Sequence, residues 1–183
     1  MTFRNPFKYY SDRKLMLISI ASIFLGSFII WQLNCSFDGV FHMTAVEMNF
    51  VSVLFQTITI VVLLSVFLFF SAKIFNKKVR LADCLNVSAL SRVPMYLLPL
   101  QNVNGALSKQ SALLEQGKLP QIDTFLVITS FLSLGVLILS ILILVMGYKV
   151  AANAKKTLHY VYLVLALILA DFVSRYILPY VNI

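Results

Sequence analysis

Three charged side chains lie inside stretches that are otherwise apolar: Arg92, Asp171 and Arg175. An ionisable group at membrane depth is costly, about 2.5–3.5 kcal/mol on insertion scales, and commonly marks a substrate or ion path. Asp171 and Arg175 are separated by four residues with the acid first, which is the favourable order for an ion pair on one helix. We therefore expect an inward-facing polar cluster, defined here as Arg92, Asp171, Arg175, Asn86, Ser91 and Ser174.

Two interpretations of this polar cluster remain open. In the first, Arg92 pairs with Asp171 and clamps two helices together. Arg92 lies about eight residues into its segment and Asp171 about thirteen into its own, so their levels differ by roughly 7 Å, which an arginine side chain covers. In the second, the cluster lines a path for a ligand or an ion. The near neutrality of the set, and the position of Arg175 close to the outer interface, favour the clamp.

No other residues form a pattern that indicates catalysis. The sequence has no H-E-x-x-H, no G-x-S-x-G and no G-x-x-x-x-G-K-[ST] motif, and nothing pairs a nucleophile with a base. Asp38, His42 and Glu47 are close enough in sequence to approach one another, but such spacing is common by chance. We therefore expect no enzyme activity, no catalytic residue, no cofactor and no metal site.

The composition is that of a membrane protein. Hydrophobic residues make up 60% of the 183 residues, charged residues make up 12%, and the mean hydropathy is +0.90. A soluble domain carries about 25% charged residues, because its surface has to be hydrated. Nucleic-acid binding is therefore excluded as the reason for the net charge of +8, which instead fits a topology signal or attraction to anionic headgroups. We expect one integral membrane domain over residues 1–183, with membrane lipids as partners.

A helix that crosses about 30 Å of hydrocarbon needs about 20 mostly apolar residues. Four segments meet this requirement well, and a fifth, over residues 84–100, is more polar and contains Pro94 and Pro99. Proline removes a backbone donor and clashes with the preceding turn, so this third helix should be kinked and surrounded by the other four. We expect an all-α, polytopic bundle of five spans at about 15–33, 48–72, 84–100, 124–147 and 158–181, with a short surface helix near 106–115.

Lysine and arginine placement indicates the orientation. With five spans, residues 1–14 and the loops near 73–83 and 148–157 share one side and carry most of the basic residues, whereas the other side holds only Lys109 and Lys118. We therefore expect a cytoplasmic N-terminus and an external C-terminus. Aromatic and basic residues alternate before the first span, which is typical of an interfacial lead.

Four short stretches together resemble the Yip family, five-span membrane proteins named for interaction with Ypt/Rab GTPases. The stretches are the lead Asn5-Pro6-Phe7-Lys8-Tyr9-Tyr10, the polar segment from Asp83 to Pro94, the basic loop with Gly147-Tyr148-Lys149-Val150, Asn153 and Lys155-Lys156, and Ala170-Asp171 with Ser174-Arg175. The first and fourth are similar to features of bacterial members, and the second and third to the polar third helix and the basic loop of the family.

The resemblance implies a bacterial inner-membrane protein without an established reaction. Eukaryotic members carry a long cytosolic N-terminal region, whereas here only residues 1–14 precede the first span, so GTPase binding is not expected. The leading hypothesis is a non-enzymatic protein that associates with lipids, with other membrane proteins or with itself. The alternative is a small solute or ion transporter that uses Arg92, Asp171 and Arg175, because interrupted helices often form binding sites near the midplane.

Overall fold

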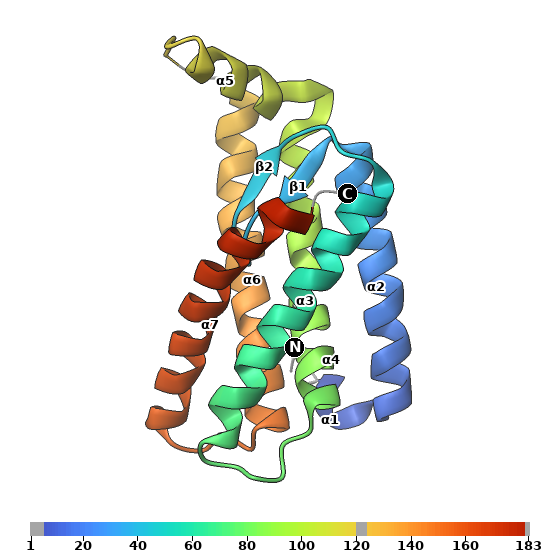
Figure 1. Ribbon diagram of the computed structural model, residues 1–183, viewed down its shortest axis with the longest axis vertical. Helices are drawn as coiled ribbons and strands as arrows, with labels where there is room; N and C mark the ends of the chain where they lie inside the picture. Colours follow the sequence, from blue (N-terminus) through green and yellow to red (C-terminus); the bar gives the residue numbers. More distant parts are fainter. Residues whose placement is uncertain (1–5, 120–123, 182–183) are drawn as a thin grey trace.

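The computed structural model describes residues 6–119 and 124–181 and is predominantly helical (Figure 1). This confirms the all-α class, to which the structure adds one small β-hairpin. Of the predicted interfacial lead, residues 1–5 lie outside the described part. The elements, in chain order, are α1 (Pro6–Tyr9), α2 (Asp12–Gln32), β1 (Cys35–Phe37), β2 (Met43–Ala45), α3 (Phe50–Lys73), α4 (Leu81–Ser91), the 3-10 helix η1 (Pro94–Gly105), α5 (Ala106–Glu115), α6 (Thr124–Ala151), α7 (Thr157–Ile177) and the 3-10 helix η2 (Leu178–Val181).

Four helices are long and apolar enough to cross a membrane, as predicted: α2, α3, α6 and α7 with its continuation to Tyr180. The shortest, α2, has 21 residues and therefore rises roughly 32 Å at about 1.5 Å per residue. Many of their apolar side chains lie on the outside of the bundle. The clearest case is α6, which has few buried residues. Such a surface suits lipid and not water.

The predicted third span, residues 84–100, is not one continuous α-helix. The α-helical part, α4, has 11 residues and ends at Ser91, and a 3-10 helix begins at Pro94 and includes Pro99. Proline lacks the backbone N–H that the α-helical ladder needs, and its ring restricts the residue before it. The α-helix therefore stops before the first proline, and α4 by itself is too short to be counted among the four long helices.

The polar segment α4 lies inside the bundle. It packs against α2, α3 and α6, whereas α7 packs mainly on α3. Every residue of α4 from Asn86 to Ser91 is buried. The segment is therefore sheltered by three of the long helices, whereas the sequence had predicted all four.

Glycines allow the closest approaches around this segment. A Cβ atom at Gly147 of α6 would lie 2.8 Å from both γ carbons of Val87 on α4. A Cβ atom at Gly26 of α2 would overlap the ring of Tyr96 on η1. Real Cβ atoms do not approach carbon so closely, so both positions need a residue without a side chain.

A β-hairpin covers the end of the bundle between α2 and α3, where the sequence indicated only a loop. Its strands are antiparallel, with Cys35 opposite Ala45 and Phe37 opposite Met43. Asn34 follows the C-cap of α2 with a φ of 49°, a left-handed conformation that asparagine tolerates and that reverses the chain after a helix. The first strand is completely buried, so the hairpin forms part of the core.

The two ends of the bundle carry different elements (Figure 1). One end carries α1 and the connections 74–80 and 152–156. The other end carries the hairpin, α5 and η2. The surface helix α5, Ala106–Glu115, has the bounds that the sequence predicted, and the left-handed residues Asn104 and Gly105 lead the chain into it.

Candidate functional site

Arg92 is the most deeply buried charged residue that the structure describes. It is the C-cap of α4 and is 2% exposed. Its Nη1 donates a hydrogen bond of 2.7 Å to the carbonyl oxygen of Val40 in the hairpin turn. One face of its guanidinium lies over the ring of Phe37, 4.6 Å from the ring centroid. The hairpin therefore supplies both a main-chain acceptor and an aromatic surface to this cation.

The remaining hydrogen-bond capacity of Arg92 is not satisfied by the described residues. Nε and Nη2 are buried and form no hydrogen bond of ordinary geometry with the described residues, although the hydroxyl of Tyr96 lies close enough to the guanidinium to interact with it. A buried charge is unfavourable unless it is paired and fully hydrogen-bonded. A cation–π contact and one hydrogen bond offset only part of this.

Asp171 and Arg175 form an ion pair on α7. Nη2 of Arg175 lies 3.0 Å from Oδ2 of Asp171, and Nε donates to the same oxygen at 3.1 Å. The other carboxylate oxygen, Oδ1, accepts a hydrogen bond of 3.2 Å from the backbone N–H of Phe41. A Cβ atom at Gly39 would lie 2.9 Å from Oδ1, so the turn approaches this carboxylate through its glycine.

The hairpin turn thus joins the two charged sites that were expected to pair directly. Arg92 donates a hydrogen bond to the carbonyl oxygen of Val40, and Asp171 accepts one from the backbone N–H of Phe41, the next residue. No ion pair joins Arg92 to Asp171 in the part of the chain that the structure describes. The direct clamp expected between the third and fifth segments is replaced by an indirect one, in which both charges bind the turn.

The other members of the polar cluster are used locally. Asn86 accepts a hydrogen bond of 3.1 Å from Ser19 of α2 and lines a pocket of about 230 Å³ near Arg80, at the opposite end of α4 from Arg92. Ser91 donates to the carbonyl oxygen of Ser88, and Ser174 donates to that of Asp171. The structure therefore brings together Asp171 and Arg175, places Arg92 across the turn from them, and leaves Asn86, Ser91 and Ser174 in separate contacts.

Sequence reasoning missed the turn residues Gly39, Val40 and Phe41. A usable signal was present, because Asp38-Gly39 is a turn pair between two short stretches that contain residues common in strands. What could not be read from the sequence was that the turn enters the bundle, since neither Val40 nor Phe41 carries a polar side chain. Their contribution is made entirely by main-chain groups.

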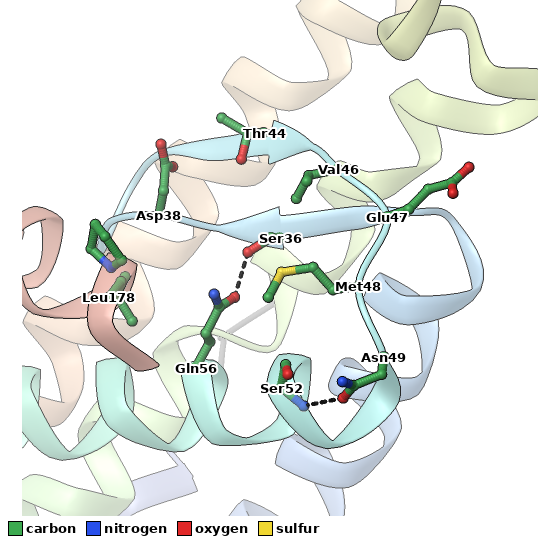
Figure 2. A pocket seen from close by; sticks show the side chains of 11 residues that line it. Ser36, Asp38, Thr44, Val46, Glu47, Met48, Asn49, Ser52, Gln56 and Leu178 are labelled. Atoms are coloured by element: carbon green, nitrogen blue, oxygen red, sulfur yellow. Dashed lines mark hydrogen bonds between the residues drawn. The ribbon is translucent and has the colours of Figure 1, made fainter. Parts of the chain in front are cut away.

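A pocket of about 590 Å³ lies beneath the hairpin (Figure 2). Gln56 of α3 bonds to Ser36 of β1 across it, and Asn49 accepts a hydrogen bond of 2.8 Å from the N–H of Ser52 at the start of α3. Figure 2 places the carboxylates of Asp38 and Glu47 at opposite ends of the hairpin. Apolar groups make up more of the pocket wall than polar ones do, and its two acidic side chains do not converge.

Residues that could ligate a metal do not gather in the described residues. Asp38 approaches His42, with Oδ1 2.5 Å from Nδ1, but no group of three histidine, cysteine, aspartate or glutamate side chains occurs there. Burial raises the pKa of Cys35, on the first strand of the hairpin, to about 11, although a hydrogen bond with Asn102 acts in the opposite direction. A thiol in this state is a poor nucleophile and a poor metal ligand at neutral pH.

Two charged side chains from different helices hold the hairpin turn in place. No model of a known protein family, no curated protein and no solved structure matches this chain. A functional assignment therefore depends on the geometry of Arg92, Asp171 and the hairpin turn.

Proposed function

We propose that the chain is a non-enzymatic, five-span membrane protein of the Yip type, which acts by association with lipids, with other membrane proteins or with itself. In this proposal α4 and η1 together form the third span, bent at Pro94. The N-terminus is cytoplasmic and the C-terminus is external, in a bacterial inner membrane. The observation that carries the proposal is that both charged sites at membrane depth bind the same hairpin turn.

The dimensions of α4 and η1 support a fifth crossing. The 11 residues of α4 rise roughly 16 Å, and residues 94–102 of η1 rise roughly 18 Å at about 2.0 Å per residue. Together they reach roughly 34 Å, which exceeds a hydrocarbon thickness of about 30 Å. The two helices also follow one another along the long axis of the bundle (Figure 1).

The charge distribution supports the orientation. The end that carries α1 and the connections 74–80 and 152–156 holds a basic set, whereas Asp38, Glu47 and Glu115 belong to the other end. Cytoplasmic loops carry an excess of lysine and arginine. The basic set comprises Lys8, Arg13, Lys14, Lys73, Lys77, Lys78, Arg80, Lys149, Lys155 and Lys156.

The outer surface supports association in the membrane. The apolar helix α6 has few buried residues, and an open groove of about 470 Å³ is lined by side chains of α6 and α7, including Ile141 and Ile168. Asp171 and Arg175 lie along the same groove. Apolar walls beside one ion pair suit a lipid chain with its headgroup or the helix of a partner.

Topology is tested by cysteine labelling from each side of sealed vesicles. Ser11→Cys and Tyr180→Cys are each introduced into a Cys35→Ala/Cys84→Ala background, since both native cysteines are buried. Five spans predict that a membrane-impermeant maleimide reaches the two positions from opposite sides. Labelling of both positions from one side would require an even number of spans and would overturn the proposal.

The functional part is tested in proteoliposomes and by native mass spectrometry. The proposal predicts no protein-dependent solute or ion flux, together with retained lipids or a discrete oligomer in mild detergent. A flux that is present in the wild type and lost in Asp171→Asn would replace the proposal with the transport alternative. Asp38→Asn is the matched control, because it makes the same change at a carboxylate that pairs with His42 and lies outside the polar cluster.

A further inference from the structure

The consecutive helices α6 and α7 pack on different partners. The main contacts of α6 are with α4 and η1, whereas those of α7 are with α3. The open groove of about 470 Å³ is lined by both helices, with Ile141 on the α6 wall and Val164 and Ile168 on the α7 wall. Phe41 of the hairpin turn also lines it. Because these walls are apolar and the groove is open to the outside of the bundle, lipid fills it more favourably than water.

The α7 wall of this groove is one continuous stripe of the helix. Its members recur at intervals of three and four residues, which places them on a single face. They are Val164, Leu167, Ile168, Asp171, Phe172 and Arg175. From Val164 to Arg175 the stripe rises roughly 16 Å at about 1.5 Å per residue, which is close to half of a hydrocarbon thickness of about 30 Å. The stripe is therefore as long as an acyl chain that occupies one leaflet.

A cation lies at one end of the stripe. Arg175 belongs to the last turn of α7, and its Nε and Nη2 both contact a single oxygen, Oδ2 of Asp171. Nη1 and the second N–H of Nη2 have no hydrogen-bond partner among residues 6–119 and 124–181. They form the other fork of the guanidinium, which matches two oxygens of a phosphate group. The side chain is 54% exposed, so this fork is open to an anion from outside.

The hairpin turn holds this guanidinium in place without covering the open fork. Asp171, which binds one edge of Arg175, is itself held by the backbone N–H of Phe41. A Cβ atom at Gly39 would lie 3.5 Å from Nε of Arg175, so the turn also lies close to the guanidinium. A side chain that is already positioned loses less conformational freedom when it binds an anion.

We propose that the groove between α6 and α7 binds one phospholipid of the outer leaflet, with its phosphate on the Nη1–Nη2 fork of Arg175 and one acyl chain along the α7 stripe. The inference rests on the proposed function, which places this end of α7 at the external face and leaves open whether a lipid or a partner helix fills the groove. A phospholipid is favoured over an apolar partner helix, because it supplies an anion at the level where the apolar walls end at a half-exposed cation.

Binding is tested on the full chain in mild detergent with two probes that share their acyl chains. Dioleoylphosphatidylglycerol carries the phosphate, and dioleoylglycerol lacks it. Native mass spectrometry measures the fraction of protein with one bound lipid, and the unfolding midpoint is recorded over the same titration. Dioleoylphosphatidylglycerol is expected to saturate at one molecule and to bind about tenfold or more tightly than dioleoylglycerol. Sodium phosphate, which has no acyl chain, is expected to leave the midpoint unchanged.

The variants separate the headgroup contact from the chain contact. Arg175→Gln removes the fork and should weaken dioleoylphosphatidylglycerol binding by about tenfold. Ile168→Trp fills the groove beside the chain and should weaken it by about threefold or more. Lys109→Gln, the matched control, removes one exposed positive charge from α5, outside the groove, and should retain the wild-type affinity.

Three results would overturn the phospholipid site. They are equal affinity for the two lipid probes, equal affinity of Arg175→Gln and Lys109→Gln, and an equal rise of the midpoint with sodium phosphate alone. If Arg175→Gln does not fold, unchanged affinity in Ile168→Trp would overturn the site instead. None of these results contradicts the proposed function, which fails on a protein-dependent solute flux or on labelling of both chain ends from one side.

Discussion

Replacing Gly147 by alanine tests whether α4 is enclosed as tightly as the structure describes. The new Cβ atom would lie 2.8 Å from both γ carbons of Val87 and 2.9 Å from Cε2 of Phe7. Carbon atoms pack at about 3.5–4.0 Å, so the overlap with each γ carbon is roughly 0.7 Å or more. Rotation of Val87 does not relieve it, because both γ carbons are equally close and valine in a helix strongly prefers one rotamer.

The expected change in the free energy of unfolding has two parts of opposite sign. Alanine is favoured over glycine inside a helix by up to about 1 kcal/mol. Overpacking of a filled core is unfavourable by about 1–3 kcal/mol. Gly135, on the same helix, provides the matched control, because its new Cβ atom would meet nothing within 4 Å. Gly147→Ala is therefore expected to be less stable than Gly135→Ala by about 1–3 kcal/mol.

The assay is unfolding in mixed micelles, followed by circular dichroism as the denaturing detergent increases. Gly135→Ala is expected to match or exceed the wild type, and Gly147→Ala to fall below Gly135→Ala. Val87→Ala removes both γ carbons, so the double variant Gly147→Ala/Val87→Ala should be more stable than the sum of the single changes predicts, with a coupling of about 0.5–3 kcal/mol. Equal stability of the two alanine variants, or no coupling, would refute the tight contact between α4 and α6.

The hairpin and the start of α3 give three further predictions. Arg92→Met is expected to lower the yield of folded protein in size-exclusion chromatography. The double variant Arg92→Asp/Asp171→Arg is also expected to give a low yield, because the two residues bind different peptide groups of the turn. A wild-type yield of the double variant would instead indicate a direct pair. Burial raises the pKa of Cys35 from 9.0 to about 11. As the pH rises, the thiol therefore ionises in the unfolded chain before it ionises in the folded protein. Its contribution to stability is present below pH 9 and is lost as the pH rises toward 11. Cys35→Ala should flatten this part of the measured pH profile, and an identical profile would contradict the assignment. Asn49→Ala should lower the free energy of unfolding by about 1 kcal/mol, because it removes the cap on the N–H of Ser52, whereas Asn49→Asp should retain most of it; a stable alanine variant would show that this cap contributes little.

The long helices could be predicted from the sequence because their signal is local. A run of about 20 apolar residues has to cross or leave the membrane as a helix, since no water is available for its backbone groups. The short helix α5 was predicted with its observed bounds, Ala106–Glu115, because Gly105 and Gly117 delimit it within a polar connection. Pro94 and Pro99 likewise indicated that the third segment is irregular, although the sequence did not predict that its α-helix ends at Ser91.

The hairpin and its contacts could not be predicted in the same way. Val40 lies 52 positions from Arg92, and Phe41 lies 130 positions from Asp171. Both contacts use backbone atoms of the turn, which every residue type carries, so the identity of the side chains contains no record of them. The expected pairing of Arg92 with Asp171 was reasonable from charge and level alone, yet the turn lies between them.

Residue types by themselves determined that this chain is helical, apolar on its outside and basic at one set of loops, because each of these properties follows from composition and spacing within a segment. Only the tertiary structure decided what the charged groups touch. The reason is physical: a buried guanidinium or carboxylate binds whichever donor or acceptor the fold brings within about 3 Å, and that distance is set by the packing of Gly39 and Phe37 against two helices remote in the chain.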